Sequence, residues 1–90
     1  MTKEKLNPLD NTKELEENLK EIILFNDDVN TFDFVIETLV DVCGHDPHQA
    51  EQCAMVAHYN GKCAVKSVTF VELKPVCEEM INRKLSASIN

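Results

Sequence analysis

The feature that most constrains the fold is a short apolar run, Ile22-Ile23-Leu24-Phe25, which stops abruptly at Asn26-Asp27-Asp28. Successive side chains of a strand point to opposite faces of a sheet, so a run that is apolar throughout predicts a strand that is central or covered on both faces. Asn and Asp favour turns, and apolar helical spacing begins again at Phe32. The sequence therefore predicts a buried strand, a polar turn and a helix. Loops that are held by such rigid elements often carry functional residues.

The whole chain predicts an α+β domain with the order strand, helix, helix, strand, helix, strand. We expect strands at residues 21–26, 62–68 and 86–89, and helices at residues 31–43, 47–58 and 70–84. The expected N-caps are Asn30 or Thr31, then Asp46 and Thr69, and the expected helix ends are Gly44 and Gly61. A small three-stranded antiparallel sheet covered on one face by three helices is the economical packing.

Two details of these elements are specific enough to test. Pro75 falls in the second turn of the last helix, where it should bend the helix or displace its start. Strict alternation in the second strand places one set of side chains on one face and the next set on the other. The two sets are Cys63, Val65 and Ser67, and Ala64, Lys66 and Val68.

The first twenty residues are mostly charged or polar and contain few large apolar side chains. We interpret residues 1–20 as a flexible N-terminal extension and residues 21–90 as the core domain. The N-terminus lacks the apolar stretch of a signal peptide, and no run reaches the roughly 20 apolar residues of a membrane span. We therefore expect a cytoplasmic protein, in which the four cysteines stay reduced.

The charge is unevenly distributed along the chain. The formal net charge is −7, and residues 21–61 hold eight carboxylates and no Lys or Arg. Nucleic-acid binding depends on neutralising phosphates, so this balance argues against a nucleic-acid partner. An acidic field around the polar turn would attract a cationic group, although many acidic domains simply present a solvated acidic face.

One segment offers the residue types of a metal site. Cys43-Gly44-His45-Asp46-Pro47-His48 contains a cysteine and two histidines, but zinc usually takes two paired sets of Cys and His ligands. No Cys-x-x-Cys motif exists, and Cys53 and Cys77 fall at apolar helical positions, where free cysteine acts as a small hydrophobe. We therefore expect no metal, and surface positions for His45 and His48.

A thiol enzyme is a further alternative. Cys63 lies close to His58 in sequence, and such a pair can form a reactive thiolate. No third group is evident to orient the histidine, and the chain contains no phosphate-binding loop or dinucleotide motif. His58 itself lies at the end of a predicted helix, where the helix dipole alone could satisfy it.

Three motifs together resemble the ClpS family, adaptors of the bacterial Clp protease. The motifs are Ile23-Leu24-Phe25-Asn26-Asp27-Asp28, Phe34-Val35-Ile36 and Val56-Ala57-His58-Tyr59-Asn60-Gly61-Lys62, with Ala50 between the last two. The resemblance implies a compact domain that binds N-degrons, proteins whose first residue is Phe, Tyr, Trp or Leu. It implies delivery to the N-terminal domain of a Clp AAA+ unfoldase of the ClpA or ClpC type. It implies no catalysis, cofactor, membrane or nucleic acid.

The resemblance also implies individual roles. The residues that would hold the substrate's α-amino group are Asn26, Asp27, Asp28 and His58. Those around its first side chain would be Leu24, Asn30, Phe32, Val35, Ala54 and Ala57. Those that would meet the unfoldase are Glu72 and Lys74. An ammonium has three donors, and an amide oxygen, a carboxylate and a neutral imidazole nitrogen are three acceptors.

This chain departs from the family pattern in its expected pocket. Phe32 and Ala54 stand where relatives commonly carry methionine, and the loop after Cys63 is about two residues shorter than usual. The alternative of a different class is a structural interaction module, because the C-terminal domain of a ribosomal stalk protein has a similar topology. Such a module would need neither the Asn-Asp-Asp turn nor His58.

Overall fold

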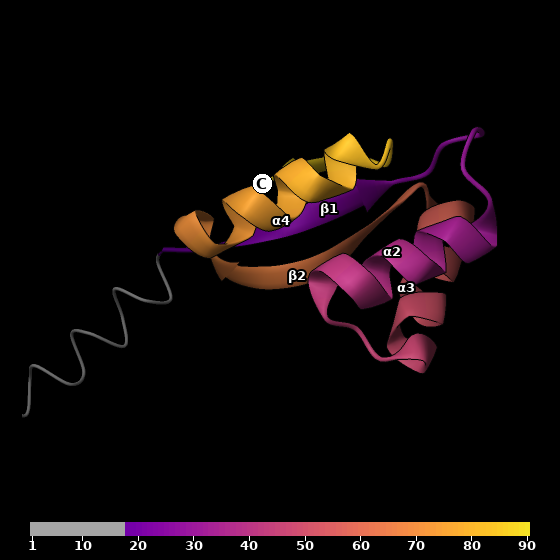
Figure 1. Ribbon diagram of the computed structural model, residues 1–90, viewed down its shortest axis with the longest axis horizontal. Coiled ribbons are helices and arrows are strands. Elements are labelled where there is room, and N and C mark those ends of the chain that lie inside the picture. The colour runs from indigo at the N-terminus through magenta and orange to yellow at the C-terminus, as the bar shows by residue number, and fades with distance from the viewer. Residues whose placement is uncertain (1–17) are drawn as a thin grey trace, which may run out of the picture.

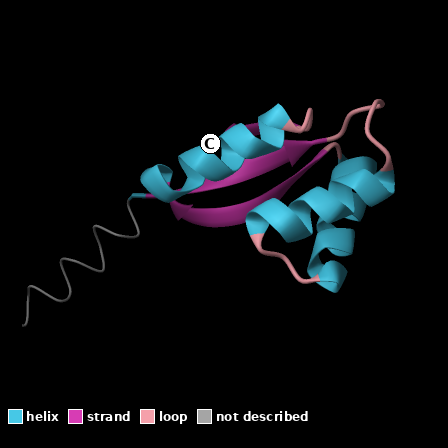
Figure 2. Cartoon of the chain, in the orientation of Figure 1, coloured by secondary structure: helices cyan, strands magenta, loops and turns pink. Residues whose placement is uncertain are grey.

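The computed structural model describes residues 18–90, which form three strands and three helices in the predicted order (Figures 1 and 2). The elements are β1 (Leu19–Phe25), α2 (Phe32–Cys43), α3 (Pro47–Asn60), β2 (Lys62–Thr69), α4 (Phe70–Asn82) and β3 (Ser86–Ile89). The strands form one antiparallel sheet in the order β2-β1-β3. The predicted fold class is confirmed. Residues 1–17 of the predicted extension lie outside the described residues, and β1 begins two residues earlier than predicted.

The central strand β1 buries one face and exposes the other. Ile22 and Leu24 are 0% and 2% exposed and belong to the hydrophobic core. Ile23 is half-buried and Phe25 is 39% exposed on the opposite face. The apolar run therefore marked a central strand, as predicted, but only its core side is fully covered. α4 contacts all three strands, whereas α3 contacts mainly α2 and β2.

Local side-chain chemistry starts and stops the helices. The side-chain oxygens of Thr31, Asp46 and Thr69 accept hydrogen bonds from the backbone N–H groups of Phe34, Gln49 and Glu72. These contacts satisfy donors that the first helical turn leaves free. Gly44 and Gly61 follow α2 and α3 with φ of 77° and 94°, a left-handed conformation that glycine adopts without steric cost.

The C-terminal end of α4 is formed without a glycine. The helix starts at Phe70 and continues through Pro75, so the proline does not displace its start. The N–H of Lys84 donates to Ile81 O, and the N–H of Leu85 donates to Met80 O at 3.0 Å. This is a Schellman motif in which Lys84, with φ of 74°, occupies the position that usually holds glycine. The absence of glycine explains why the sequence suggested a helix two residues too long.

An irregularity in β2 changes which side chains face the core. Ile22 pairs with Lys66 and Ile23 with Ala64, so Val65 has no partner in the ladder. Val65 is buried and Val68 packs against the core, so the strict alternation predicted for this strand is wrong. A β-bulge of this kind adds one residue and resets the alternation beyond it.

The prediction that His45 lies on the surface is also wrong. His45 is 5% exposed, and its Nε2–H donates to Val65 O at 2.6 Å. The carbonyl that the bulge releases from the ladder is thereby satisfied, and the edge of β2 is covered at this point. His48, in the same interhelical turn, is exposed as expected.

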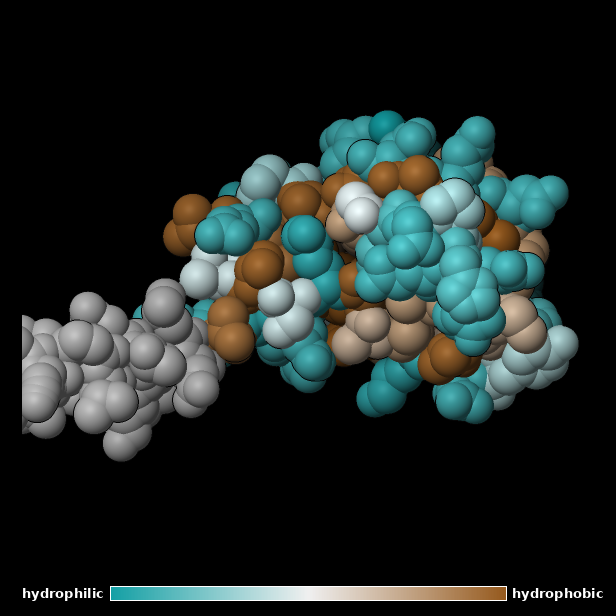
Figure 3. Space-filling model, turned by 90° about the horizontal axis from the view of Figure 1, so that it is seen from below, coloured by the Kyte–Doolittle hydropathy of each residue, from teal (hydrophilic) through white to brown (hydrophobic). Residues whose placement is uncertain are grey.

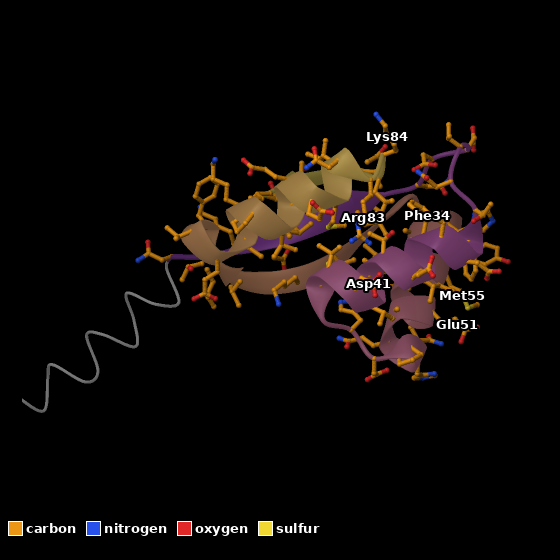
Figure 4. The ribbon with its side chains drawn as sticks, in the orientation of Figure 1. Phe34, Asp41, Glu51, Met55, Arg83 and Lys84 are labelled. Atoms are coloured by element: carbon orange, nitrogen blue, oxygen red, sulfur yellow. The ribbon has the colours of Figure 1, made fainter. Side chains whose placement is uncertain are left out.

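An ion pair joins α2 to the end of α4. Arg83 Nη1 lies 3.4 Å from Asp41 Oδ2, and Arg83 Nε lies 2.9 Å from Glu79 Oε2 (Figure 4). These groups are partly exposed, so the pairs add little stability by themselves. None of the helices within residues 18–90 is both long and apolar enough to cross a membrane.

The burial of β1 predicts a difference between two identical substitutions. Ile22→Val should lower the free energy of unfolding by about 0.5–1.5 kcal/mol, because it removes a fully buried methylene group. Ile81→Val, at a position that is 50% exposed, should change it by less than about 0.5 kcal/mol. Urea denaturation of both variants measures the difference. Equal losses would show that β1 is not the centre of the core.

Candidate functional site

A cavity of about 610 Å³ opens where β1 runs through its loop into α2, against the last turns of α3. The loop is the pink segment at the upper right of Figure 2. The cavity is lined by Leu24, Phe25, Asn26, Asp27, Asp28, Asn30, Phe32, Val35, Ala54, Met55, His58 and Tyr59. Its walls therefore come from both sequence segments that were predicted to share a site.

A backbone hydrogen bond explains why these segments meet. The N–H of Asn26 donates to Gly61 O at 3.0 Å, where β1 and β2 end their pairing. Gly61 terminates α3, and His58 occupies the last turn of that helix. The polar triplet after β1 is thus fixed beside the C-terminal end of α3.

Asp27 organises the loop itself. Its Oδ1 accepts hydrogen bonds from the N–H groups of Val29 at 2.9 Å and Asn30 at 2.8 Å, and its Oδ2 accepts one from Asn30 Nδ2 at 3.0 Å. Burial raises the pKa of the Asp27 carboxyl, but the hydrogen bonds from Asn30 and Val29 stabilise the charged form and leave the pKa below its ordinary value of 3.8. The oxygens of Asp27 are therefore engaged in holding the turn.

Asn30 ties this loop to a distant part of the chain. Its Nδ2 also donates to the backbone carbonyl of Lys84 at 2.8 Å. Figure 4 places Lys84 at the end of α4, on the side of the molecule where the loop passes. Asn30 lines the cavity as predicted, but its amide group serves as a bridge between the loop and the α4–β3 turn.

The cavity has an apolar floor and a polar mouth. Leu24 and Ala54 are 2% and 3% exposed, and both belong to the apolar lining of the cavity. Asn26, Asp28 and His58 are exposed, and within residues 18–90 their side chains make no hydrogen bond or ion pair. The mouth therefore offers an amide, a carboxylate and an imidazole with open hydrogen-bonding positions.

The structure brings together all but one of the residues predicted for the two parts of the pocket. Ala57 is the exception, because it is 4% exposed and packs into the core cluster without lining the cavity. Sequence reasoning missed Phe25, Met55 and Tyr59. Met55 and Tyr59 are four residues apart on α3, which is the spacing of one helix face and could have indicated them. The roles of the individual residues remain predictions.

Two aromatic rings flank the imidazole of His58. The ring centroid of Phe32 lies 6.4 Å from that of His58 with an interplanar angle of 82°. The ring of Tyr59 lies 4.8 Å away with an angle of 78°. The Phe32–His58 pair is an edge-to-face contact between α2 and α3, and the His58–Tyr59 pair is an edge-to-face contact within α3.

Two of the thiols, Cys43 and Cys53, are poorly suited to catalysis. Burial raises the pKa of Cys43 to about 11, and burial together with the neighbouring Cys63 thiol raises the pKa of Cys53 to about 11. These thiols stay protonated at neutral pH, whereas the thiolate is the nucleophile. Across residues 18–90, His, Cys, Asp and Glu side chains do not gather in threes or more in an arrangement that could hold a metal ion.

The two residues predicted to meet a partner lie on the first turns of α4. Glu72 and Lys74 are exposed, and Lys74 Nζ lies 2.9 Å from Glu78 Oε2. Phe70 and Val71 beside them are 47% and 79% exposed. Figure 3 shows hydrophobic side chains among hydrophilic ones at the end of the molecule where α4 begins. This surface combines apolar and charged groups.

Comparisons with known proteins point to one family. Residues 16–88 match the family model described as "ATP-dependent Clp protease adaptor protein ClpS". The chain is similar to the ClpS adapter protein of Campylobacter jejuni strain 81-176, with 40% identity over 57 residues, 63% of this chain and 59% of that protein. It is 38% identical over 65 residues to the ClpS adapter protein of Edwardsiella ictaluri, covering 72% of this chain and 60% of that one. The matches thus span less than two thirds of these relatives.

A solved structure shares the fold. The structure of Agrobacterium tumefaciens ClpS2 bound to L-phenylalaninamide superposes with a TM-score of 0.76 at 22% sequence identity. The match covers 81% of this chain and 95% of that chain.

The hydrogen bonds of Asp27 predict a pH-dependent contribution to stability. Because its pKa is lower in the folded chain than in the unfolded one, the contribution is present above the ordinary pKa and is lost as the pH falls through the folded value. Asp27→Asn should therefore lower the free energy of unfolding by about 0.5–2 kcal/mol at pH 7. The difference from wild type should shrink below pH 4.

Asp28→Asn is the matched control for this measurement. It makes the same chemical change one residue further on, where the carboxylate has no hydrogen bond within the described chain, and should alter stability by less than about 0.5 kcal/mol. Chemical denaturation at several pH values measures both variants. A loss for Asp27→Asn that is constant from pH 7 to pH 3 would contradict the assigned role.

Proposed function

The chain belongs to the ClpS family of ATP-dependent Clp protease adaptors, as its motifs suggested, and we propose that it binds proteins through a free, bulky N-terminal residue and delivers them to a Clp unfoldase. The preferred first residues are Phe, Tyr, Trp and Leu. The protein acts by binding and carries out no reaction of its own.

The observation that carries this proposal is the arrangement of the cavity. Three open polar groups, on Asn26, Asp28 and His58, surround the mouth of a cavity whose floor is apolar. A substrate's α-ammonium supplies three N–H donors at the mouth, and its first side chain enters the floor. An internal peptide bond has one N–H and no charge, so it would leave the acceptors unsatisfied, which is costly in a desolvated site.

The solved relative supports the same class of ligand. L-Phenylalaninamide, which is bound to the Agrobacterium tumefaciens protein, carries a free α-amino group and a benzyl side chain. It therefore presents the two features that the polar mouth and the apolar floor of this cavity would select.

The charge distribution favours a cationic ligand. Residues 21–61 form both the loop and the two helices around the cavity, and they contain eight carboxylates without any Lys or Arg. Charges within about 8–10 Å remain effective at physiological ionic strength. An N-terminal ammonium is attracted to this field, and an acetylated N-terminus is not.

The expected affinity follows from these contacts. A hydrogen bond to a charged group contributes about 1.5–3 kcal/mol. Burial of a Leu or Phe side chain contributes about as much. After the cost of association, a dissociation constant in the micromolar range or somewhat tighter is expected.

For delivery, the proposed contact is the exposed start of α4. Glu72 and Lys74 provide charges beside the exposed Phe70 and Val71, and this surface lies on a different element from the cavity. An adaptor can therefore hold its substrate and its unfoldase at the same time. The partner is the N-terminal domain of a ClpA- or ClpC-type unfoldase.

The amine contacts predict a strict dependence on a free N-terminus. A peptide that begins with Phe should bind, and its N-acetylated form should lose nearly all affinity. Asp28→Asn should weaken binding about tenfold or more, because it removes a charge-assisted contact to the ammonium. Fluorescence anisotropy with labelled peptides measures these affinities.

Asp33→Asn serves as the control, since it removes a carboxylate from the exposed first turn of α2, outside the cavity lining. It should change the affinity by no more than about twofold. Equal binding of the acetylated and free peptides would refute the proposed function.

Ala54 predicts an unusually tolerant pocket. The small side chain forms part of the cavity wall, where a methionine would crowd a first residue that branches at Cβ. The wild type should therefore accept Ile and Val more readily than most relatives, and Ala54→Met should restore about 1–3 kcal/mol of preference for Leu over Ile. Val56→Met, on the exposed side of the same helix, is the control. An unchanged Leu-to-Ile affinity ratio in Ala54→Met would show that Ala54 does not set the selectivity.

A further inference from the structure

The imidazole of His58 stands between two aromatic rings to which the proposed function gives no part in amine binding. The ring of Phe32 is perpendicular to it at 6.4 Å, and the ring of Tyr59 is perpendicular to it at 4.8 Å. Both distances fall in the range in which edge-to-face aromatic pairs attract each other. Phe32 begins α2 and Tyr59 lies in the last turn of α3, so two elements converge on one side chain.

His58 needs such support. It is exposed, and no hydrogen bond or ion pair within residues 18–90 fixes its ring. An exposed side chain samples several rotamers unless a neighbour restricts it, and holding one rotamer costs entropy. To accept a hydrogen bond from an ammonium, the ring must keep one nitrogen lone pair directed at the cavity mouth.

We propose that Phe32 and Tyr59 are positioning residues, which hold the His58 imidazole edge-on so that its free nitrogen meets the substrate's α-amino group. The inference rests on the proposed function and adds to it a reason for the two rings. Neither ring supplies an acceptor for the amine; each acts through His58.

Tyr59 offers the cleaner test of the two. Phe32 lines the cavity and is 39% exposed, so its removal also changes the space for the first side chain. Tyr59 lies at the rim and is 76% exposed, and its hydroxyl has no hydrogen bond inside the described chain. Loss of the ring can therefore be separated from loss of the hydroxyl.

The first measurement is the affinity for a peptide that begins with Phe, compared with its N-acetylated form. Tyr59→Ala should weaken binding of the free peptide about three- to tenfold. Tyr59→Phe keeps the ring and should restore affinity to within about twofold of wild type. Val56→Ala, an exposed position on α3 outside the cavity, should bind as wild type does.

A double-mutant cycle then asks whether Tyr59 acts through His58. In a His58→Ala background, Tyr59→Ala should have little further effect, because the side chain that it positions is gone. Direct contact between Tyr59 and the peptide would instead give the same loss in both backgrounds, and that result would overturn the positioning role alone.

The second measurement needs no peptide. The Hα–Hβ couplings of His58, which report its χ1 rotamer, should move toward rotamer-averaged values in Tyr59→Ala and stay near their wild-type values in Tyr59→Phe, because only the first variant lacks the ring that holds the imidazole. Couplings that are unchanged in Tyr59→Ala would also overturn the positioning role. If wild type binds free and acetylated peptides equally, the proposed function fails, and the role of the two rings in amine binding fails with it.

Discussion

One face of β1 has to serve both the core and the cavity. Side chains alternate along a strand, so Ile22 and Leu24 must point to the same side. Ile22 is fully buried in the core, and Leu24, two residues nearer the loop, is 2% exposed and forms part of the cavity floor. An apolar cavity leaves its lining without partner atoms and costs stability, which is a heavy demand on a domain of this size. Under the proposed function, a substrate side chain that enters the cavity would complete the packing, which would link binding to folding stability.

The parts of the fold that follow from neighbouring residues were predictable. Thr31, Asp46 and Thr69 cap the helices because a short side chain can reach an N–H three residues on. Gly44 and Gly61 end helices because they adopt a positive φ without strain. The two segments of the site could be paired from the sequence only through the family resemblance. The structure supplies the physical link, a hydrogen bond from Asn26 to Gly61.

The wrong predictions have two kinds of cause: a contact between distant residues, and a local motif that lacks its usual glycine. His45 was expected at the surface because its neighbours form a turn, but the bulge at Val65 presents a carbonyl that His45 satisfies. Lys84 was placed in a helix because nothing local marks it as a C-terminal residue, yet it takes the left-handed position of a Schellman motif. Asp27 was grouped with the amine-binding residues; its oxygens accept hydrogen bonds within the turn, and its role toward an amine stays a prediction. Only the folded chain shows which of two adjacent aspartates has free acceptors.

That division between Asp27 and Asp28 leaves the mouth of the cavity with an ordered loop and an open carboxylate. The loop is fixed at three points: by the N–H of Asn26, by the turn around Asp27, and by the amide of Asn30 on the carbonyl of Lys84. Because the loop is already ordered, a ligand need not order it on binding, and less of the interaction energy is lost. A chain without a free ammonium would have to desolvate the remaining acceptors without satisfying them. Under the proposed function, the discrimination would depend as much on the unpaired groups that a wrong ligand leaves behind as on the contacts that a right one makes.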